Sequence, residues 1–143
     1  MMSRRTSRVA VVAALLTTFF LLSIDSAQAQ STRMKATIPF AFSWGNGVLP
    51  AGEYDVDSLG HGVTKLFNRD THAVVVFNTI GVNKPTSEAV NAKLIFNRYG
   101  EDYFLKEMWW AGATDGRALL PSKAEREVAR TSTPVRIVSV AVR

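Results

Sequence analysis

Large apolar residues alternate with smaller or polar ones at the start of the stretch that organises the chain, residues 38–54. Ile38, Phe40 and Phe42 recur with a period of two, which predicts a strand with one large-apolar face. The following triplet at residues 45–47, GNG, tolerates the positive φ that a reversing turn needs. An LPAG corner then leads into the next strand. The pattern therefore predicts a strand, a tight turn and a second strand.

Further strand patterns follow along the chain, separated by frequent turn signals. The residues from Ala73 to Ile80, AVVVFNTI, are apolar at nearly every position, which predicts a central strand covered on both sides. Residues 81–91 and 112–117 are expected to be loops. The predicted strands are residues 35–42, 53–59, 63–69, 73–80, 92–98, 103–110 and 135–142.

One short helix is predicted near the C-terminus. Ser122 and Glu125 have the spacing of a capping box, in which the hydroxyl accepts from an early backbone N–H and the glutamate reaches back. A charged, helix-favouring run follows. Because so short a helix is not stable alone, we expect it to pack on the sheet through Ala124, Val128 and Ala129.

Together these elements predict an all-β, mainly antiparallel domain. About seven strands separated by frequent turns are typical of a small β-sandwich or flattened barrel. The short C-terminal helix is expected to cover one end or edge of it.

The first 29 residues have the organisation of a secretory signal peptide. Three arginines precede an uncharged, mostly apolar run at residues 9–24, and Ala27-Gln28-Ala29 then supplies a small-residue cleavage site. The run is shorter than the ~20 apolar residues that a membrane-spanning helix needs. We therefore expect a signal-peptide helix within residues 1–29, no transmembrane anchor after cleavage, and a single exported β domain at residues 30–143, periplasmic or extracellular.

Composition narrows the classes of partner. The chain of 143 residues has 17 Lys and Arg, 12 Asp and Glu, and no cysteine. Because the leader carries three Arg and one Asp, the expected mature domain has a net charge of +3. It has no dense basic block, so nucleic acid is not an expected partner. Without cysteine there is no disulfide, thiol chemistry or cysteine metal site, and stability depends on the apolar core.

Several motifs together resemble a family of small exported bacterial proteins of uncharacterised function. The motifs are an IPFxF strand followed by LPAGxY, here Ile38 to Tyr54, and a strand pair of the KLxFxRYGxxYFLxExW type, here Lys93 to Trp109. A charged helix of the PxSxAERExAR type follows, here Pro121 to Arg130, with Ser122 directly after the proline. The resemblance implies export and a single β domain, and it brings no activity, cofactor or catalytic residue.

Tryptophans are the leading candidates for a binding site. Trp109 and Trp110 are neighbours on a predicted strand and point to opposite faces. One is expected in the core. The other either lies under the helix or the 112–117 loop, or points outward. The covered position is favoured because large apolar residues are usually buried. An outward ring near Tyr103 could stack on a sugar, a peptide or a partner's surface. Trp44, beside the 45–47 turn, is a further candidate that either binds or closes an open sandwich end.

No nucleophile, base and oxyanion set assembles in the sequence, so no catalytic residue and no cofactor is predicted. His61 and His72 lie at predicted turns and are too few for a zinc site, so no metal is predicted. Asp55 and Asp57 lie two residues apart on one strand face, a spacing that suggests a carboxylate pair for hydrolysis. A solvated strand face is the commoner cause of such a pair.

A basic stripe is a further candidate for binding acidic polysaccharide or anionic lipid. It would contain Lys65, Arg69, Lys93 and Arg98 if the two similar segments KLFNR and KLIFNR were neighbouring strands. A solvated sheet face is the more common origin of such charges.

These observations lead to an expected function and two alternatives. We expect an exported, non-catalytic β-sandwich module that binds a ligand or assembles with a protein at the cell envelope or outside it. The alternative is a small secreted hydrolase that uses carboxylates such as Asp55 and Asp57. An outer-membrane barrel is a third hypothesis, which the charged residues within the predicted strands disfavour.

Overall fold

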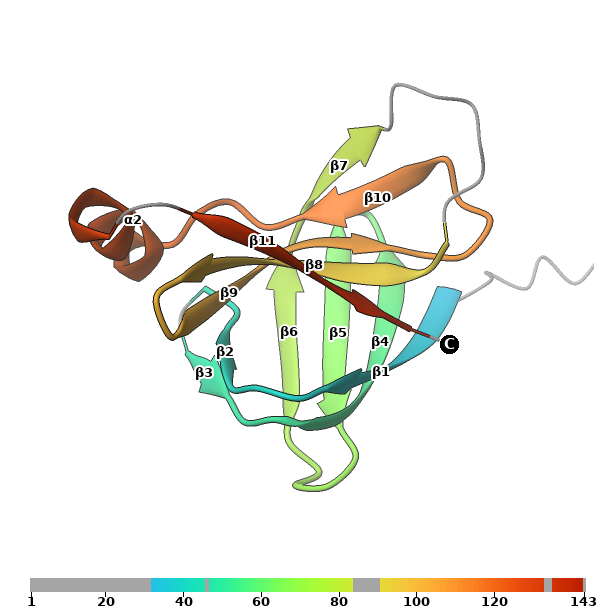
Figure 1. Cartoon of the computed structure of the whole chain (residues 1–143). Coiled ribbons are helices and arrows are strands. Elements are labelled where there is room, and N and C mark those ends of the chain that lie inside the picture. The colour runs from blue at the N-terminus through green and yellow to red at the C-terminus, as the bar shows by residue number, and fades with distance from the viewer. Residues whose placement is uncertain (1–31, 46, 84–90, 133–134, 143) are drawn as a thin grey trace, which may run out of the picture. The chain divides into compact units, whose positions relative to one another are not determined.

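A computed structural model describes residues 32–45, 47–83, 91–132 and 135–142, nearly all of them in strands and turns (Figure 1). The predicted signal peptide lies outside the described residues. The described strands and helix belong to one compact unit, Ser31–Arg143. The helix is α2 (Lys123–Thr131). The strands are β1 (Thr32–Ile38), β2 (Phe42–Ser43), β3 (Val48–Leu49), β4 (Gly52–Gly60), β5 (Val63–Asn68), β6 (Val74–Asn78), β7 (Ile80–Asn83), β8 (Lys93–Tyr99), β9 (Asp102–Trp109), β10 (Asp115–Ala118) and β11 (Arg136–Ala141).

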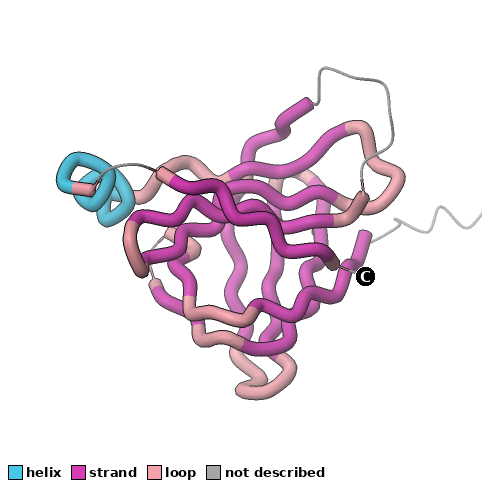
Figure 2. The backbone as a smooth tube through the Cα atoms, in the orientation of Figure 1, coloured by secondary structure: helices cyan, strands magenta, loops and turns pink. Residues whose placement is uncertain are grey.

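Two sheets form this unit (Figure 2). The first sheet has the strand order β1-β4-β5-β6, with every pair antiparallel. The second sheet has the order β11-β8-β9-β10-β7. The short β2–β3 hairpin joins the second sheet through a parallel bridge between Ser43 and Phe104 of β9. The predicted small all-β sandwich, mainly antiparallel with one short C-terminal helix, is thereby confirmed.

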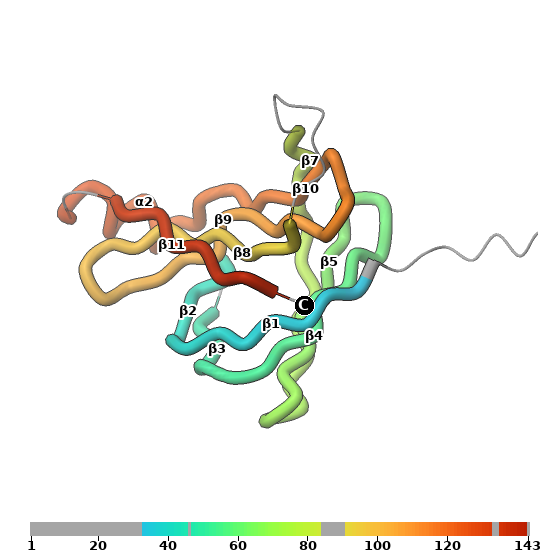
Figure 3. The backbone as a smooth tube through the Cα atoms, turned by 45° about the vertical axis from the view of Figure 1, so that its right-hand side comes forward, coloured from blue at the N-terminus to red at the C-terminus, as the bar shows by residue number. Residues whose placement is uncertain are grey.

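The two sheets meet differently at their margins. β1 and β11, edge strands of the first and the second sheet, lie side by side (Figure 3). At the other end of the first sheet, β6 is the terminal strand, and none of the described strands pairs with its outer edge. The chain then passes directly from β6 into β7 of the second sheet. The sandwich is therefore closer to closure at the β1–β11 margin than at β6.

An aromatic cluster joins the two sheets in the core. Phe42 packs edge-on against Tyr54 of β4 and against Phe96 of β8, with 5.4 Å between ring centroids in both pairs. All three side chains are almost completely buried. Phe40 meets the Phe96 ring edge-on at 5.1 Å. Since aromatic side chains bury more apolar area than most others, this cluster is a main source of core stability.

The predicted turn and corner between residues 44 and 54 have the geometry that their glycines permit. The Trp44 N–H donates to the Gly47 oxygen at 3.1 Å and closes the turn. The Tyr54 hydroxyl, inside the core, donates to the Pro50 oxygen at 2.6 Å. At Gly52, where φ is +156°, a Cβ atom would lie 2.5 Å from Asp70 Oδ2, so a side chain there would require the Asp70 carboxylate to move.

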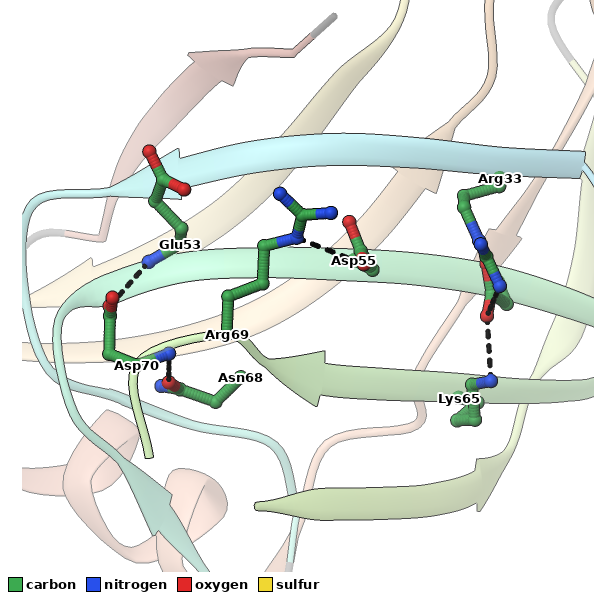
Figure 4. Close-up of polar contacts among 8 residues, drawn as sticks. Arg33, Glu53, Asp55, Lys65, Asn68, Arg69 and Asp70 are labelled. Atoms are coloured by element: carbon green, nitrogen blue, oxygen red, sulfur yellow. Dashed lines mark hydrogen bonds and ion pairs between the residues drawn. The ribbon is translucent and has the colours of Figure 1, made fainter. Parts of the chain in front are cut away.

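The turn between β5 and β6 is hydrogen-bonded to the start of β4 (Figure 4). The Arg69 N–H donates to the Glu53 oxygen at 2.8 Å, and the Glu53 N–H donates to Asp70 Oδ2 at 3.0 Å. Asn68 Oδ1 accepts from the Asp70 N–H at 2.8 Å within the turn. This turn therefore fixes the register of β4 and β5 at the LPAG corner.

The prediction that residues 73–80 form a central strand covered on both sides is wrong. β6 is the edge strand of the first sheet, with Val75 and Phe77 toward the core. Val74 and Val76 on the outer face are 55% and 52% exposed. A run of β-branched residues favours a strand wherever it lies in the sheet, so the pattern predicted the strand but not its position.

Two strands occupy segments that were predicted to be loops. β7 and β10 pair with each other in antiparallel register, with Gly81 opposite Arg117 and Gly116 opposite Val82. Both strands contain a glycine, and glycine weakens a local strand pattern. The first predicted strand also divides, because β1 ends at Ile38, before Pro39, and the chain re-enters a sheet at Phe42.

The helix α2 begins as predicted but packs differently. Its predicted N-cap is confirmed, since Ser122 Oγ accepts from the Glu125 N–H at 3.1 Å. The Glu125 carboxylate does not reach back: it accepts from Asn97 Nδ2 at 2.8 Å and from the Tyr99 hydroxyl at 3.3 Å. Burial, with the nearby Glu125 charge, raises the pKa of Tyr99.

The packing face of α2 also differs from the prediction. Glu125 is buried and Val128 half-buried, whereas Ala124 and Ala129 are exposed. The helix is therefore anchored to β8 by a carboxylate rather than by alanines. Within the described part of the chain, no helix has the length and apolar character to cross a membrane.

The contact between β10 and Trp109 leads to a stability prediction. A Cβ atom on Gly116 would lie 2.7 Å from Trp109 Cδ2 and 2.9 Å from the Met108 oxygen. Gly116→Ala should therefore lower the free energy of unfolding by about 1–3 kcal/mol, measured by urea denaturation. Gly81→Ala on the paired strand is the control, because its Cβ would meet its nearest neighbour, Arg117 Nη1, at 3.6 Å. Equal losses in the two variants would contradict this account.

Candidate functional site

Both tryptophans at the end of β9 are covered. Trp109 is 6% and Trp110 4% exposed. Trp109 lies against Gly116 of β10, and its Nε1 donates to Glu107 Oε2 at 2.9 Å. Trp110 belongs to the core cluster, and its Nε1 has no partner among the described residues. The structure therefore shows the covered arrangement and not the outward one. Part of the cover of Trp109 is Gly116 of β10, which lies in the predicted 112–117 loop.

Tyr103 is packed among other side chains rather than free to stack on a ligand. Its ring lies parallel to that of Phe40, with 3.8 Å between centroids. The Arg98 guanidinium lies over the ring at 5.2 Å from its centroid. Tyr103, Trp109 and Trp110 do not line the pocket that contains Trp44.

Trp44 lines an open groove at the β6 margin of the sandwich. Its half-buried indole packs on Phe77, with 5.6 Å between ring centroids and 32° between ring planes. The groove has a volume of about 300 Å³. Residues 77–80 at the β6–β7 junction form a second wall, and residues 118–120 after β10 form a third.

The groove is mainly apolar and continues onto the surface. Ile80 and Leu120, which both line it, are 48% and 70% exposed. Its polar lining comes from Asn78, Thr79 and Ser122. A concave apolar surface with a few polar groups is the usual form of a small-ligand site. Sequence reasoning found Trp44 but missed the other walls, because three chain segments distant in sequence form the groove.

The outer face of the first sheet carries a cluster of ion pairs, which we call the ion-pair face (Figure 4). Asp57, only 2% exposed, lies between two cations. Its carboxylate accepts from Arg33 Nε at 2.7 Å and from Arg33 Nη2 at 3.2 Å, and Lys65 Nζ lies 2.8 Å away. Burial acts to raise the pKa of Asp57, but Arg33 and Lys65 outweigh it and hold that pKa below its usual value.

Asp55 lies beside it on the same face of β4. Its Oδ2 accepts from Arg69 Nε at 3.1 Å, and its Oδ1 has no partner among the described residues. The two carboxylates share one face, as predicted, but they are buried beneath cationic side chains rather than solvated. A hydrolytic pair needs one carboxyl group kept protonated as an acid, whereas the surroundings of Asp57 keep it ionised.

The predicted basic stripe does not form. Lys65 and Arg69 belong to the β5 region of the first sheet, whereas Lys93 and Arg98 lie on β8 of the second sheet. Lys65 and Arg69 are also paired with the two buried aspartates. The similar KLFNR and KLIFNR segments are therefore not neighbouring strands.

The two histidines lie in turns, as predicted. His61 and His72 have positive φ angles of 50° and 60°. Within the described ranges, no group of three or more histidine, aspartate or glutamate side chains could hold a metal ion. The groove beside Trp44 is therefore the strongest candidate site.

We compared the chain with protein-family models, with curated proteins and with solved structures. None of the three comparisons gave a match. The resemblance of the motifs to a family of small exported proteins therefore stays a prediction, and the function is inferred from the geometry of the site.

The pKa of Asp57 leads to a prediction about acid stability. Because the folded-state pKa is lowered, the ion pairs stabilise the fold fully above the unfolded pKa of about 3.9 and are lost as the pH falls below it. Asp57→Asn should lower the free energy of unfolding by about 1–3 kcal/mol at pH 7. Between pH 7 and pH 3 the variant should lose less unfolding free energy than the wild type, measured by urea denaturation at each pH.

Asp102→Asn is the control for this series. Asp102 is exposed and forms no ion pair within the described residues, so its replacement should leave the pH profile of the wild type unchanged. Parallel profiles for the wild type and the Asp57 variant would refute the role of this carboxylate.

Proposed function

We propose that the chain is an exported, non-catalytic β-sandwich module that binds a ligand or protein partner at the cell envelope or outside it. The N-terminal sequence pattern supports export. The observation that carries the binding role is the open apolar groove beside Trp44. Its walls come from both sheets and from the segment before α2.

The dimensions of the groove restrict what it binds. A volume of about 300 Å³ accommodates an apolar ring or side chain rather than a large cofactor. Burying one Leu- or Phe-sized group contributes only about 1.5–3 kcal/mol. A partner of useful affinity must therefore extend beyond the groove, over the exposed side chains of Ile80 and Leu120.

The ion-pair face supports a non-catalytic role. Its buried carboxylates are held by Arg33, Lys65 and Arg69, and the groove lies elsewhere. A structural role for Asp55 and Asp57 accounts for their burial and their cationic neighbours. The hydrolase alternative has no comparable observation in its favour.

Tryptophan fluorescence tests the binding site. Because Trp109 and Trp110 are buried and Trp44 is half-buried, iodide should quench mainly Trp44 in the protein without its leader. A ligand from a panel of glycans, peptides and lipids should protect that fraction. Trp44→Phe should remove the quenchable emission, and Trp109→Phe, the matched control, should retain it.

Two results would contradict the proposal that the binding site lies beside Trp44. Loss of the accessible emission in the Trp109 variant, or ligand binding that is unchanged in Trp44→Ala, would place the binding site elsewhere. Circular dichroism of each variant verifies that the fold is retained.

A further inference from the structure

The outer edge of β6 has backbone groups ready to pair with another strand. The backbone bonds that flank β6, at Ala73 and Thr79, join it to β5. Since bonded positions alternate along an antiparallel strand, the odd-numbered residues of β6 bond to β5 and the even-numbered ones face the other way. None of the described strands lies on that side. The residues whose N–H and C=O groups face the free edge are Val74, Val76 and Asn78.

This edge lacks the features that normally prevent pairing. Edge strands are usually protected by charged residues, proline or bulges. The segment from Ala73 to Asn83, which covers β6 and β7, has no charged residue and no proline. By contrast, the edge strand β1 carries Arg33 and Lys35, and β11 begins with Arg136. The β6 edge is therefore unprotected where the β1 and β11 edges carry charge.

We propose that β6 pairs antiparallel with β6 of a second copy of this chain, around a two-fold axis at Val76. Val76 then lies opposite the partner's Val76, and Val74 lies opposite the partner's Asn78. All three edge-facing residues of each copy form bonded pairs, and each pair exchanges two backbone hydrogen bonds. The first sheets of the two copies become one continuous sheet.

The absence of charge and the exposed valines of β6 favour a second copy as the occupant. A two-fold axis brings the same residues of both copies together, so a charged edge would repel itself, whereas this edge is neutral. The nearest cation of the neighbouring strand, Lys65, forms an ion pair with Asp57 at 2.8 Å. The outer-face side chains of Val74 and Val76 are half exposed and lie beside Phe67 and Lys65 of β5, respectively. Pairing covers these valines. Asn78, whose backbone joins the pair, also lines the groove at Trp44, so the paired edge borders the groove, but the inference does not rest on ligand binding there.

Sedimentation over a concentration series tests the pairing. The weight-average mass of the wild-type chain without its leader should rise from that of a monomer toward that of a dimer. Val76→Lys places two ammonium groups opposite each other and should raise the dissociation constant at least tenfold. Ile137→Lys is the control, because Ile137 is a similarly exposed residue on the edge strand β11 and should leave the constant unchanged.

A cysteine cross-link provides a second measurement. The chain has no cysteine, so Val76→Cys introduces a single thiol. Bonded pairs in antiparallel strands have Cα atoms about 5.5 Å apart, within the range of a disulfide. Mild oxidation should therefore give a disulfide-linked dimer with Val76→Cys and not with Ile137→Cys.

Three results would overturn the pairing at β6. The first is a wild-type chain that stays monomeric at every concentration. The second is an equal dissociation constant for Val76→Lys and Ile137→Lys. The third is an equal yield of disulfide-linked dimer from Val76→Cys and Ile137→Cys. Circular dichroism of the lysine variants separates loss of pairing from loss of fold.

Discussion

The packing of Phe42 between Tyr54 and Phe96 is the contact on which the two sheets depend. Without disulfides, the sheets are held together by their apolar faces, and these rings meet at that interface. Phe42 belongs to the second sheet and Tyr54 to the first, although only a short hairpin separates them in sequence. The stretch at residues 38–54 therefore organises the fold because it crosses from one sheet to the other and back.

A second crossing, between β6 and β7, determines where the groove lies. β6 ends the first sheet and β7 ends the second, so the chain changes sheets at Thr79. The groove opens at this crossing, between residues 77–80 and residues 118–120. Trp44 packs on Phe77 at this point and fills part of the space. The groove is what the indole leaves open, which explains why its walls come from three separate segments.

The sequence was sufficient for most of the longer strands and for the helix N-cap at Ser122, because both depend on local periodicity and short-range hydrogen bonds. It did not predict which strand is the edge, since Ala73 to Ile80 has the composition of a central strand. It also missed the β7–β10 pair, whose residues are far apart in sequence and include glycine. At the candidate site, Trp44 was predictable from its turn, whereas Phe77 and Leu120 line the same groove only because the two sheets pack together in the folded chain.

The outer face of the first sheet is divided into two chemically different halves. On β1 and β4 the buried carboxylates of Asp55 and Asp57 require cations, and Arg33, Lys65 and Arg69 supply them. Buried charges without partners are too costly to persist, so this half is closed by its own side chains. The outer-face valines of β6 have no charge that needs a partner, and they are exposed. They lie next to an edge with which none of the described strands pairs. The two halves share one sheet, and because the aspartates of the ionic half are paired with cations of the same sheet, the proposed pairing with a second copy involves the apolar half.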